Sequence, residues 1–404
     1  MSPEESTVLS LLRAGWVVPV SGRPIRDGAV AIGGGRIVWV GPANSPGAPQ
    51  GVVRDLGPGV LMPGLVNAHC HLELGHLAGQ LDGAKGFVPW VEALVAARGS
   101  ASPDVVEAAT AEGARALVAT GTVAVGDVSN GVAHLDMLAR SGLAAAIVFY
   151  ELLSWDPAKA ESVLQFAEAR AREVAEDLPG NVQVRLAAHA PHSVSAPLLL
   201  ALARRGGPAA IHLAESLAES AFLARGDGEW AGFLERRGLG YVAFTPPRVS
   251  PVAYLDGLGT LHPTLVAAHC AQADEADIGL LAAHGVAVAV CPRSNRRLGV
   301  RIPPVPAMLA AGVRVAIGTD SLASANSLDL MEDVALLHRE FPEIDPARLV
   351  RMATDGGAQA LGLLDLGTVE PGKRAALAYA PADTTPQDPL AFLVSGVRVV
   401  PVGA

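Results

Sequence analysis

Eight apolar stretches of strand length recur through the middle of the chain, with helix-like segments between them. They lie at residues 65–68, 122–126, 144–150, 182–188, 209–211, 265–268, 286–290 and 313–318. Buried parallel strands read as continuous runs of Val, Ile, Leu and Ala because helices cover both of their faces. The series predicts an α/β fold with a (β/α)8 TIM-like barrel, and a doubly wound sheet is the competing arrangement.

Titratable or metal-binding side chains follow these stretches along the chain. In order they are His69 with His71, Asp127, Glu151, His189, His212, His269, Cys291 and Asp320. A barrel gathers the carboxyl ends of its strands around one mouth, where the loops build the active site. The sequence therefore predicts that these side chains converge, although they are far apart in the chain.

The two chain ends have a different pattern. Short apolar or alternating stretches occupy residues 15–61 and 367–404, and Gly33, Gly34 and Gly35 stand where a hairpin must turn. We expect residues 1–61 and 367–404 to form one small β-sandwich domain. Residues 62–366 would then form the metal-dependent barrel.

Composition excludes several classes of protein. The formal net charge is -10 and no basic run is present, which argues against a nucleic-acid partner. No stretch reaches the roughly 18 apolar residues of a membrane span, and the N-terminus lacks the pattern of a secretory signal. Three widely spaced cysteines do not suggest a disulfide framework, so we expect a cytoplasmic protein whose cysteines fill apolar space. Nothing here excludes a homo-oligomer.

The pair His69-x-His71 follows a buried strand, so both imidazoles can turn towards a single divalent metal ion. His212 can supply a third nitrogen, and Asp320 can bind the metal and accept a proton. Glu215 can stay off the metal and carry protons. His269 is either a ligand or a hydrogen-bond donor to the attacking oxygen.

A single metal is favoured over a bridged pair. The chain has only three lysines, Lys85, Lys159 and Lys373, and none of them ends a predicted strand. A modified lysine therefore cannot bridge two metals at the fourth strand, where His189 stands. Glu151 remains an alternative bridging ligand.

The combined motifs resemble the amidohydrolase superfamily, in particular its branch of cytosine-, guanine- and adenosine-type deaminases and chlorohydrolases. The segments that carry the resemblance are 62–71 (MPGLVNAHCH), 212–215 (HLAE), 268–270 (AHC) and 318–321 (GTDS). The resemblance implies one zinc or iron ion, with zinc favoured, bound by His69, His71, His212 and Asp320. It also implies that Glu215 shuttles protons and that His269 orients the hydroxide.

A narrower resemblance points to the 6-aminodeoxyfutalosine deaminases. It rests on segments 71–74 (HLEL), 86–90 (GFVPW), 190–193 (APHS) and 320–324 (DSLAS). Related S-adenosylhomocysteine and methylthioadenosine deaminases commonly carry a tyrosine near His192, which argues against those substrates here. The expected substrate-contacting residues are Glu73, Phe87, Trp90, Glu151, His189, His192 and Ser324.

These residues suggest different contacts with a nucleoside. Phe87 and Trp90 can stack on a ring, although simple packing explains them equally well. Glu73 and His189 can bond to ribose hydroxyls. The favoured substrate also carries an aryl carboxylate, and the arginines considered for it are Arg248, Arg293, Arg296 and Arg297.

The sequence thus predicts a metal-dependent hydrolytic deaminase that converts 6-aminodeoxyfutalosine to the corresponding futalosine with release of ammonia, in menaquinone biosynthesis. The alternative within enzymes is a chlorohydrolase, or a deaminase of cytosine, guanine or S-adenosylhomocysteine. The alternative of another class is a catalytically silent relative that binds a nucleoside. Detection of bound metal and of ammonia release separates these hypotheses.

Overall fold

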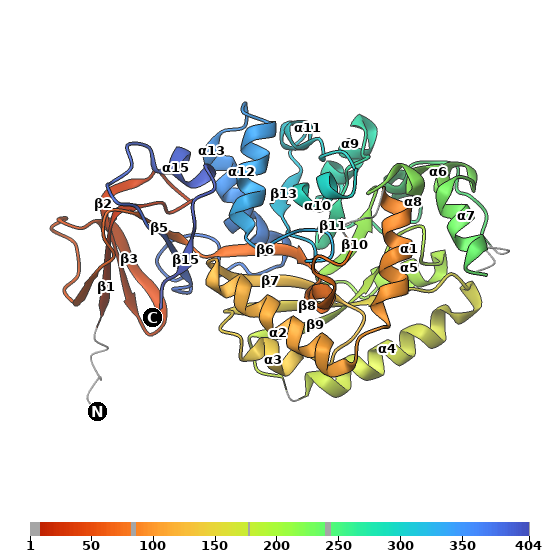
Figure 1. Ribbon diagram of the computed structural model, residues 1–404. Helices are drawn as coiled ribbons and strands as arrows, with labels where there is room; N and C mark the ends of the chain where they lie inside the picture. The colour runs from red at the N-terminus through yellow and green to blue at the C-terminus, as the bar shows by residue number, and fades with distance from the viewer. Residues whose placement is uncertain (1–8, 82–85, 177, 239–243, 404) are drawn as a thin grey trace.

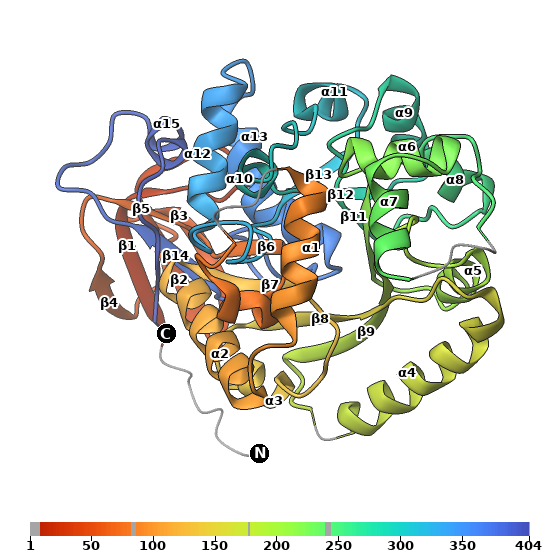
Figure 2. The same ribbon diagram turned by 45° about the vertical axis from the view of Figure 1, so that its right-hand side comes forward.

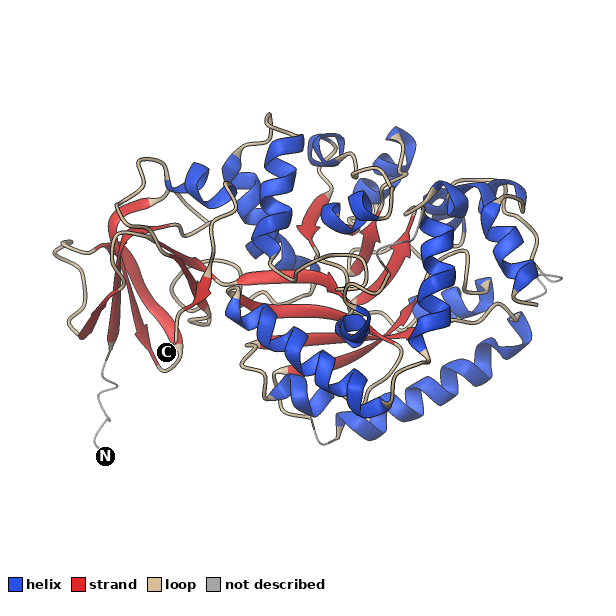
Figure 3. Ribbon diagram, in the orientation of Figure 1, coloured by secondary structure: helices blue, strands red, loops and turns tan. Residues whose placement is uncertain are grey.

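The structure is a computed structural model that describes residues 9–81, 86–176, 178–238 and 244–403 (Figure 1). A β-rich part built from both chain ends lies beside a larger part in which helices surround parallel strands (Figure 3). None of the described helices is long and apolar enough to cross a membrane.

The terminal segments form one seven-stranded sheet. Its strands are β1 (Ser10–Val17), β2 (Ile25–Gly33), β3 (Arg36–Pro42), β4 (Val52–Asp55), β5 (Val60–Pro63), β14 (Leu377–Ala380) and β15 (Val400–Pro401). The order is β15-β14-β5-β1-β2-β3, and β4 pairs with β1. The predicted hairpin turn joins β2 to β3, where Gly34 and Gly35 have positive φ values of 57° and 72°. The two chain ends therefore share a sheet, while the sandwich arrangement and the exact domain boundaries stay predictions.

Each of the eight apolar stretches contributes to a parallel strand. The strands are β6 (Leu65–Cys70), β7 (Thr122–Ser129), β8 (Ala145–Leu152), β9 (Val182–Ala188), β10 (Ala209–Leu213), β11 (Leu265–His269), β12 (Ala287–Val290) and β13 (Arg314–Ile317). They form two four-stranded sheets, β6-β7-β8-β9 and β10-β11-β12-β13. Strand order follows chain order in both, whereas a doubly wound sheet reverses its order at a switch point.

Backbone contacts link the two parallel sheets on both sides. The His212 amide donates to the carbonyl of His189 at 2.8 Å, which joins the ends of β9 and β10. On the other side the Asp320 amide donates to the carbonyl of His69 at 3.1 Å, and Cys70 forms a parallel bridge with Asp320. These contacts bring the carboxyl ends of the strands towards one region.

The described part of the chain contains many helices, and several of them pack around the parallel strands (Figure 2). They are η1 (Leu72–Leu77), α1 (Phe87–Arg98), α2 (Pro103–Ala119), α3 (Leu135–Ala139), η2 (Pro157–Lys159), α4 (Ala160–Ala175), α5 (Ala196–Ala203), α6 (Leu217–Arg225), α7 (Glu229–Arg236), α8 (Pro251–Gly257), α9 (Glu275–Ala283), α10 (Pro292–Arg297), α11 (Val305–Ala310), α12 (Leu330–Glu340), α13 (Pro346–Arg351), η3 (Met352–Gly356), α14 (Gly357–Ala360) and α15 (Pro389–Val394). The large apolar cluster between helices and strands supplies the main hydrophobic stabilisation.

The terminal sheet connects directly to the strand that carries the histidine pair. β5 ends at Pro63 and β6 begins at Leu65, so only Gly64 separates them. A side chain at Gly64 would meet Val123 of β7, because a Cβ atom there would lie 2.2 Å from Cγ1. Gly64 thus lets β6 enter the parallel sheet while β5 stays in the terminal one.

Candidate active site

Three histidines predicted as metal ligands face one another at the ends of β6 and β10. Nε2 of His71 lies 3.1 Å from Nε2 of His212. Ligand atoms of His69, His71 and His212 all lie within 4.8 Å of one another, as the ligands of a single cation must. The rings of His69 and His71 are 4.9 Å apart and nearly perpendicular.

The hydrogen bonds and charges around these imidazoles fit a divalent cation. His212 can donate through Nδ1 to the carbonyl of His189 at 3.0 Å, which leaves the lone pair of Nε2 free. Nε2 of His69 is buried and has no hydrogen-bond partner among the described residues. Burial acts to lower the pKa of His212, but the hydrogen bond and charge of Glu151 raise it to about 9, so the site favours positive charge.

Asp320 completes this group from the loop after β13. Its Oδ1 lies 3.7 Å from Nε2 of His71 and 3.9 Å from Nε2 of His69. Hydroxyls of Ser294 and Ser324 donate to the other oxygen at 2.6 and 2.8 Å. Burial acts to raise the pKa of Asp320, but the nearby histidines and the two hydroxyls lower it overall. Asp320 is therefore held as a carboxylate, pointing towards the histidines.

Glu215 and His269 lie beside the ligand group. Oε1 of Glu215 is 3.6 Å from Nε2 of His269. Burial raises the pKa of Glu215 to about 8 and lowers that of His269 to about 4. A protonated carboxyl beside a neutral imidazole can exchange protons near neutral pH.

The backbone of Glu215 is fixed by a second buried carboxylate that the sequence did not single out. Glu219 accepts hydrogen bonds from the amides of Ala214 and Glu215 at 3.2 and 2.8 Å. Glu219 is 1% exposed and comes from the first turn of α6. It therefore orients the loop that presents Glu215.

Strained backbone is concentrated at the same strand ends. Ala214, His269, Cys270 and Asp320 have positive φ values of 49°, 70°, 50° and 57°. L-residues adopt this left-handed region only in a few per cent of cases, and such conformations persist where the surrounding structure imposes them, often at functional sites. Each residue stands in or beside the group just described, so the strain marks this rim as functional.

Gly318 allows β13 to approach the first histidine closely. A Cβ atom at Gly318 would lie 2.7 Å from the carbonyl oxygen of His69 and 2.8 Å from its Cβ. Behind the histidines, burial raises the pKa of the Cys291 thiol well above its ordinary value. The Cys291 thiol is therefore held protonated, and its role as an apolar filler stays a prediction.

Glu151 and His189 lie on the far side of the His212 ring from His71. Oε1 of Glu151 is 3.4 Å from Nδ1 of His212, and its other oxygen accepts from Asn130 at 3.0 Å. His189 bonds through Nδ1 to the Ser193 hydroxyl at 2.5 Å, and burial is the leading cause that lowers its pKa to about 3. Ligand atoms of Glu151, His189 and His212 also lie within 4.8 Å of one another, so a bridging role for Glu151 remains an alternative.

A cavity of about 240 Å³ opens above these groups. The predicted residues that line it are Glu73, Phe87, Trp90, Glu151, His189, His192, His71, His212, Glu215, His269 and Asp320. Ser324 does not line the cavity, because it is buried behind Asp320 and bonds to it. The expectation that Ser324 contacts substrate is therefore replaced by a role in holding Asp320. Asp127 does not line the cavity either. Its carboxylate accepts a hydrogen bond from the Leu72 amide and bonds to the ring of His134.

The aromatic and acidic side chains on one wall of the cavity are firmly held. Glu73 pairs with Arg98 and accepts from the Ser129 hydroxyl at 2.7 Å. The rings of Phe87 and Trp90 lie 6.5 Å apart on α1. The His192 ring meets Trp230 edge-on at 4.4 Å, and neither of its nitrogens has a hydrogen-bond partner among the described residues.

The four arginines proposed as carboxylate partners do not line the cavity. Arg293 is held instead by Asp333 and Ser327, and Arg296 pairs with Glu340. Two arginines that the sequence gave no reason to choose, Arg98 and Arg237, do line it. Arg98 is the last residue of α1, and Arg237 caps α7. Both reach the cavity because these helices pack over the strand ends, which the sequence alone does not show.

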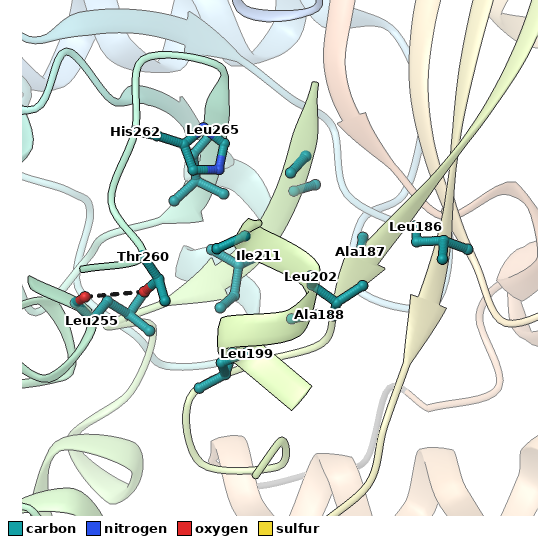
Figure 4. A pocket seen from close by; sticks show the side chains of 13 residues that line it. Leu186, Ala187, Ala188, Leu199, Leu202, Ile211, Leu255, Thr260, His262 and Leu265 are labelled. Atoms are coloured by element: carbon teal, nitrogen blue, oxygen red, sulfur yellow. Dashed lines mark hydrogen bonds between the residues drawn. The ribbon is translucent and has the colours of Figure 1, made fainter. Parts of the chain in front are cut away.

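A second, smaller hollow lies away from this chemistry. It is lined almost entirely by apolar side chains such as Leu199, Leu202, Ile211 and Leu255 (Figure 4). The Thr260 hydroxyl on its edge is already bonded to the Leu255 carbonyl at 3.0 Å. We interpret this hollow as imperfect packing between α5, α8 and the strands.

Comparison with known proteins identifies the family to which the chain belongs. The model of the Amidohydrolase family matches residues 60–402. A 5-methylthioadenosine/S-adenosylhomocysteine deaminase from Nitratidesulfovibrio vulgaris is 35% identical over 364 residues, covering 86% of this chain and 77% of the relative. An aminodeoxyfutalosine deaminase from Deinococcus radiodurans is 35% identical over 319 residues, covering 75% of this chain and 73% of the relative.

A solved structure agrees over nearly the whole chain. The zinc-bound adenosine deaminase from Xanthomonas campestris superposes with a TM-score of 0.79 at 27% identity, covering 97% of this chain and 92% of that one.

The chain belongs to the amidohydrolase family, and it is a hydrolase that acts on C–N bonds. The fold of this family is a TIM-like barrel with a small additional domain. Both named groups of deaminase match at the same identity, and the methylthioadenosine/S-adenosylhomocysteine relative covers the larger share of this chain. Sequence identity therefore does not favour aminodeoxyfutalosine over methylthioadenosine or S-adenosylhomocysteine as the substrate. It also does not support excluding the latter two substrates because of His192.

Proposed function

We propose that this protein is a zinc-dependent hydrolytic deaminase of adenosine-like nucleosides, and that its substrate is 6-aminodeoxyfutalosine in menaquinone biosynthesis. The observation that carries the activity is the convergence of His69, His71, His212 and Asp320 on one point, with Glu215 beside them at the floor of a cavity. The names of the relatives support a nucleoside as substrate. We further propose that the eight strands close into one barrel.

The three imidazoles and the Asp320 carboxylate would hold the cation, a donor set that suits zinc. When bound, a divalent cation would supply Lewis acidity, which can lower the pKa of water to about 7. The hydroxyls of Ser294 and Ser324 fix Asp320 so that it does not rotate away from the histidines.

Proton transfer falls to Glu215 and His269. Attack of water at C6 of an adenine ring places electrons on ring N1, which then needs a proton. Glu215 is buried and holds a proton near neutral pH, so it can donate that proton to N1. As a carboxylate it can then take a proton from the attacking oxygen and deliver it to the departing amine, and the last proton of that oxygen restores Glu215 as the C6 carbonyl forms. His269 and Asp320 orient the attacking oxygen, and ammonia leaves.

The remaining cavity residues suit the rest of a nucleoside. Phe87 and Trp90 offer aromatic surface for a planar ring. The Glu73 carboxylate and His189 present polar atoms suited to ribose hydroxyls. These are proposed contacts, and each is separately accessible to mutation.

The test is a substrate screen with zinc-loaded protein. Adenosine, 5′-methylthioadenosine, S-adenosylhomocysteine and 6-aminodeoxyfutalosine are compared by the absorbance change from adenine to hypoxanthine and by ammonia release. The highest kcat/KM is expected for 6-aminodeoxyfutalosine. Chloride release from halogenated triazines without ammonia release from nucleosides would favour the chlorohydrolase alternative. Nucleoside binding without turnover would favour the silent relative.

A further inference from the structure

Helices α1 and α7 form the outer walls of the cavity. Val91, Leu94 and Val95 line it from α1, and Phe233 and Leu234 line it from α7. The two helices share one apolar cluster and are also joined by an ion pair between Glu92 and Arg236. The outer half of the cavity is therefore a slot between two helices, with apolar sides.

Apolar side chains of this slot are accessible to solvent. A small polar substrate would leave this apolar surface uncovered. Val95 is 36% exposed and Leu153, on the cavity rim, is 48% exposed. Trp155 and Trp230 add aromatic surface to the same region. Exposed apolar surface in a cavity is typical of a ligand-binding site whose ligand covers it.

Charge is distributed unevenly along the cavity. Its inner end carries Glu151 and Asp320 beside the histidines, and these two carboxylates disfavour an anionic part of the ligand there. Arg98 is neutralised by its pair with Glu73. Among the described residues, Arg237 is the cavity-lining arginine without a carboxylate partner, and it caps the carboxyl end of α7.

We propose that the walls of α1 and α7 together with Arg237 form a subsite for the substituent on the sugar. That substituent is apolar or aromatic along its length and ends in a carboxylate, which binds Arg237. The inference rests on the proposed function, because it assumes that the base lies at the histidines. It identifies Arg237 as a specificity residue that does not take part in the chemical step.

The experiment compares zinc-loaded wild-type, Arg237→Gln and Arg236→Gln proteins on three nucleosides. These are 6-aminodeoxyfutalosine, its carboxylate methyl ester and 5′-methylthioadenosine, which has a short neutral substituent. Arg236 is the matched control because it is the neighbouring arginine, yet its guanidinium pairs with Glu92 outside the cavity. The ester keeps the shape of the acid and removes its charge.

Loss of a charge-assisted hydrogen bond lowers kcat/KM of Arg237→Gln for the acid by about 10- to 100-fold. The same variant should keep wild-type kcat/KM for the ester and for 5′-methylthioadenosine, and Arg236→Gln should not change the acid-to-ester ratio. The loss is expected in KM rather than in kcat, because the contact is remote from the reacting atoms.

Two results would overturn the subsite. An equal loss of kcat/KM on acid and ester would give Arg237 a structural role only, and wild-type kcat/KM of Arg237→Gln on both compounds would place the anion elsewhere. Failure of the proposed function looks different, because the zinc-loaded wild-type protein would then deaminate none of the three nucleosides.

Discussion

The Glu215 carboxylate lies 3.6 Å from Nε2 of His269, and the two residues come from the ends of the adjacent strands β10 and β11. Neither belongs to the group of His69, His71 and His212 whose ligand atoms are mutually within 4.8 Å. Ligand atoms of His269 do lie within 4.8 Å of those of His69 and Cys291, whereas Glu215 belongs to no such group among the described residues. Glu215 is therefore an acidic residue set apart from the groups suited to hold a cation.

Replacing Glu215 by Gln should lower kcat by about 10²–10⁴-fold, because an amide cannot exchange the proton that a general acid–base group transfers. Zinc content should stay at the wild-type level, since Glu215 is not in the ligand group. Steady-state kinetics measures kcat, and elemental analysis of the same preparation measures the zinc content. Turnover near the wild-type rate would remove Glu215 from the mechanism.

Removing the metal should abolish deamination and lower the unfolding temperature, because a cation binds the folded ligand set only. Metal present at 100 times its Kd stabilises the fold by about 2.7 kcal/mol. Chelation followed by zinc titration, with thermal unfolding as the readout, measures both effects. His71→Ala should lose the zinc response and His284→Ala should keep it, because His284 pairs with Asp256 at the surface.

Ser294→Ala and Ser324→Ala should each weaken metal binding or activity by about 10- to 100-fold, as loss of an outer hydrogen bond to a ligand usually does. Both hydroxyls donate to the same oxygen of Asp320, so the double variant should show coupling between the two losses. Zinc affinity by competitive chelation is the measurement. Wild-type affinity in the double variant would contradict the role given to these serines.

Gly318→Ala should displace His69 and lower the free energy of unfolding by about 1–3 kcal/mol, the usual cost of overpacking. The added methyl group would press against the backbone of the strand that carries the first ligand. Gly279→Ala is the control, since it is a solvent-exposed position in α9 with open space around it. Alanine there should stabilise by about 0.5–1 kcal/mol. Denaturant unfolding measures the free energy of unfolding of both variants, which should fall for Gly318→Ala and rise for Gly279→Ala.

His134 should make stability depend on pH. Burial acts to lower the pKa of His134, but the hydrogen bond to the buried Asp127 at 2.9 Å and the charge of that carboxylate raise it overall. A raised pKa in the folded state gives stabilisation that is complete below the unfolded value of about 6.5 and is lost as pH rises through the folded value. Wild-type stability should therefore fall over this window more than that of His134→Asn, as measured by urea unfolding at several pH values.

The strand ends were the most predictable part of the site. His69, His71, His212, Glu215, His269 and Asp320 were selected from the sequence because apolar runs of strand length define where each strand stops. Parallel strands then bring their carboxyl ends together whatever their separation in the chain. The alternation of strands and helices, in chain order, is likewise set by local apolar patterns.

The cavity walls were less predictable, because they depend on how whole helices pack. Arg237 follows a helix with no local mark of function, and only the docking of α7 against α1 turns it towards the cavity. Asp127 has the sequence position of a site residue, yet its carboxylate is fully occupied by the Leu72 amide and His134. Ser324 faces Asp320 rather than the cavity, which only the conformation of the loop after β13 decides.

The left-handed backbone at Ala214, His269, Cys270 and Asp320 has a consequence for engineering this enzyme. Each such residue typically costs about 1–3 kcal/mol of folding free energy. Selection for heat resistance alone should relax these positions first, for example by introducing glycine, and the resulting proteins would last longer while turning over more slowly. Durable variants that keep full activity should carry their substitutions elsewhere, on the helical exterior or in the terminal sheet.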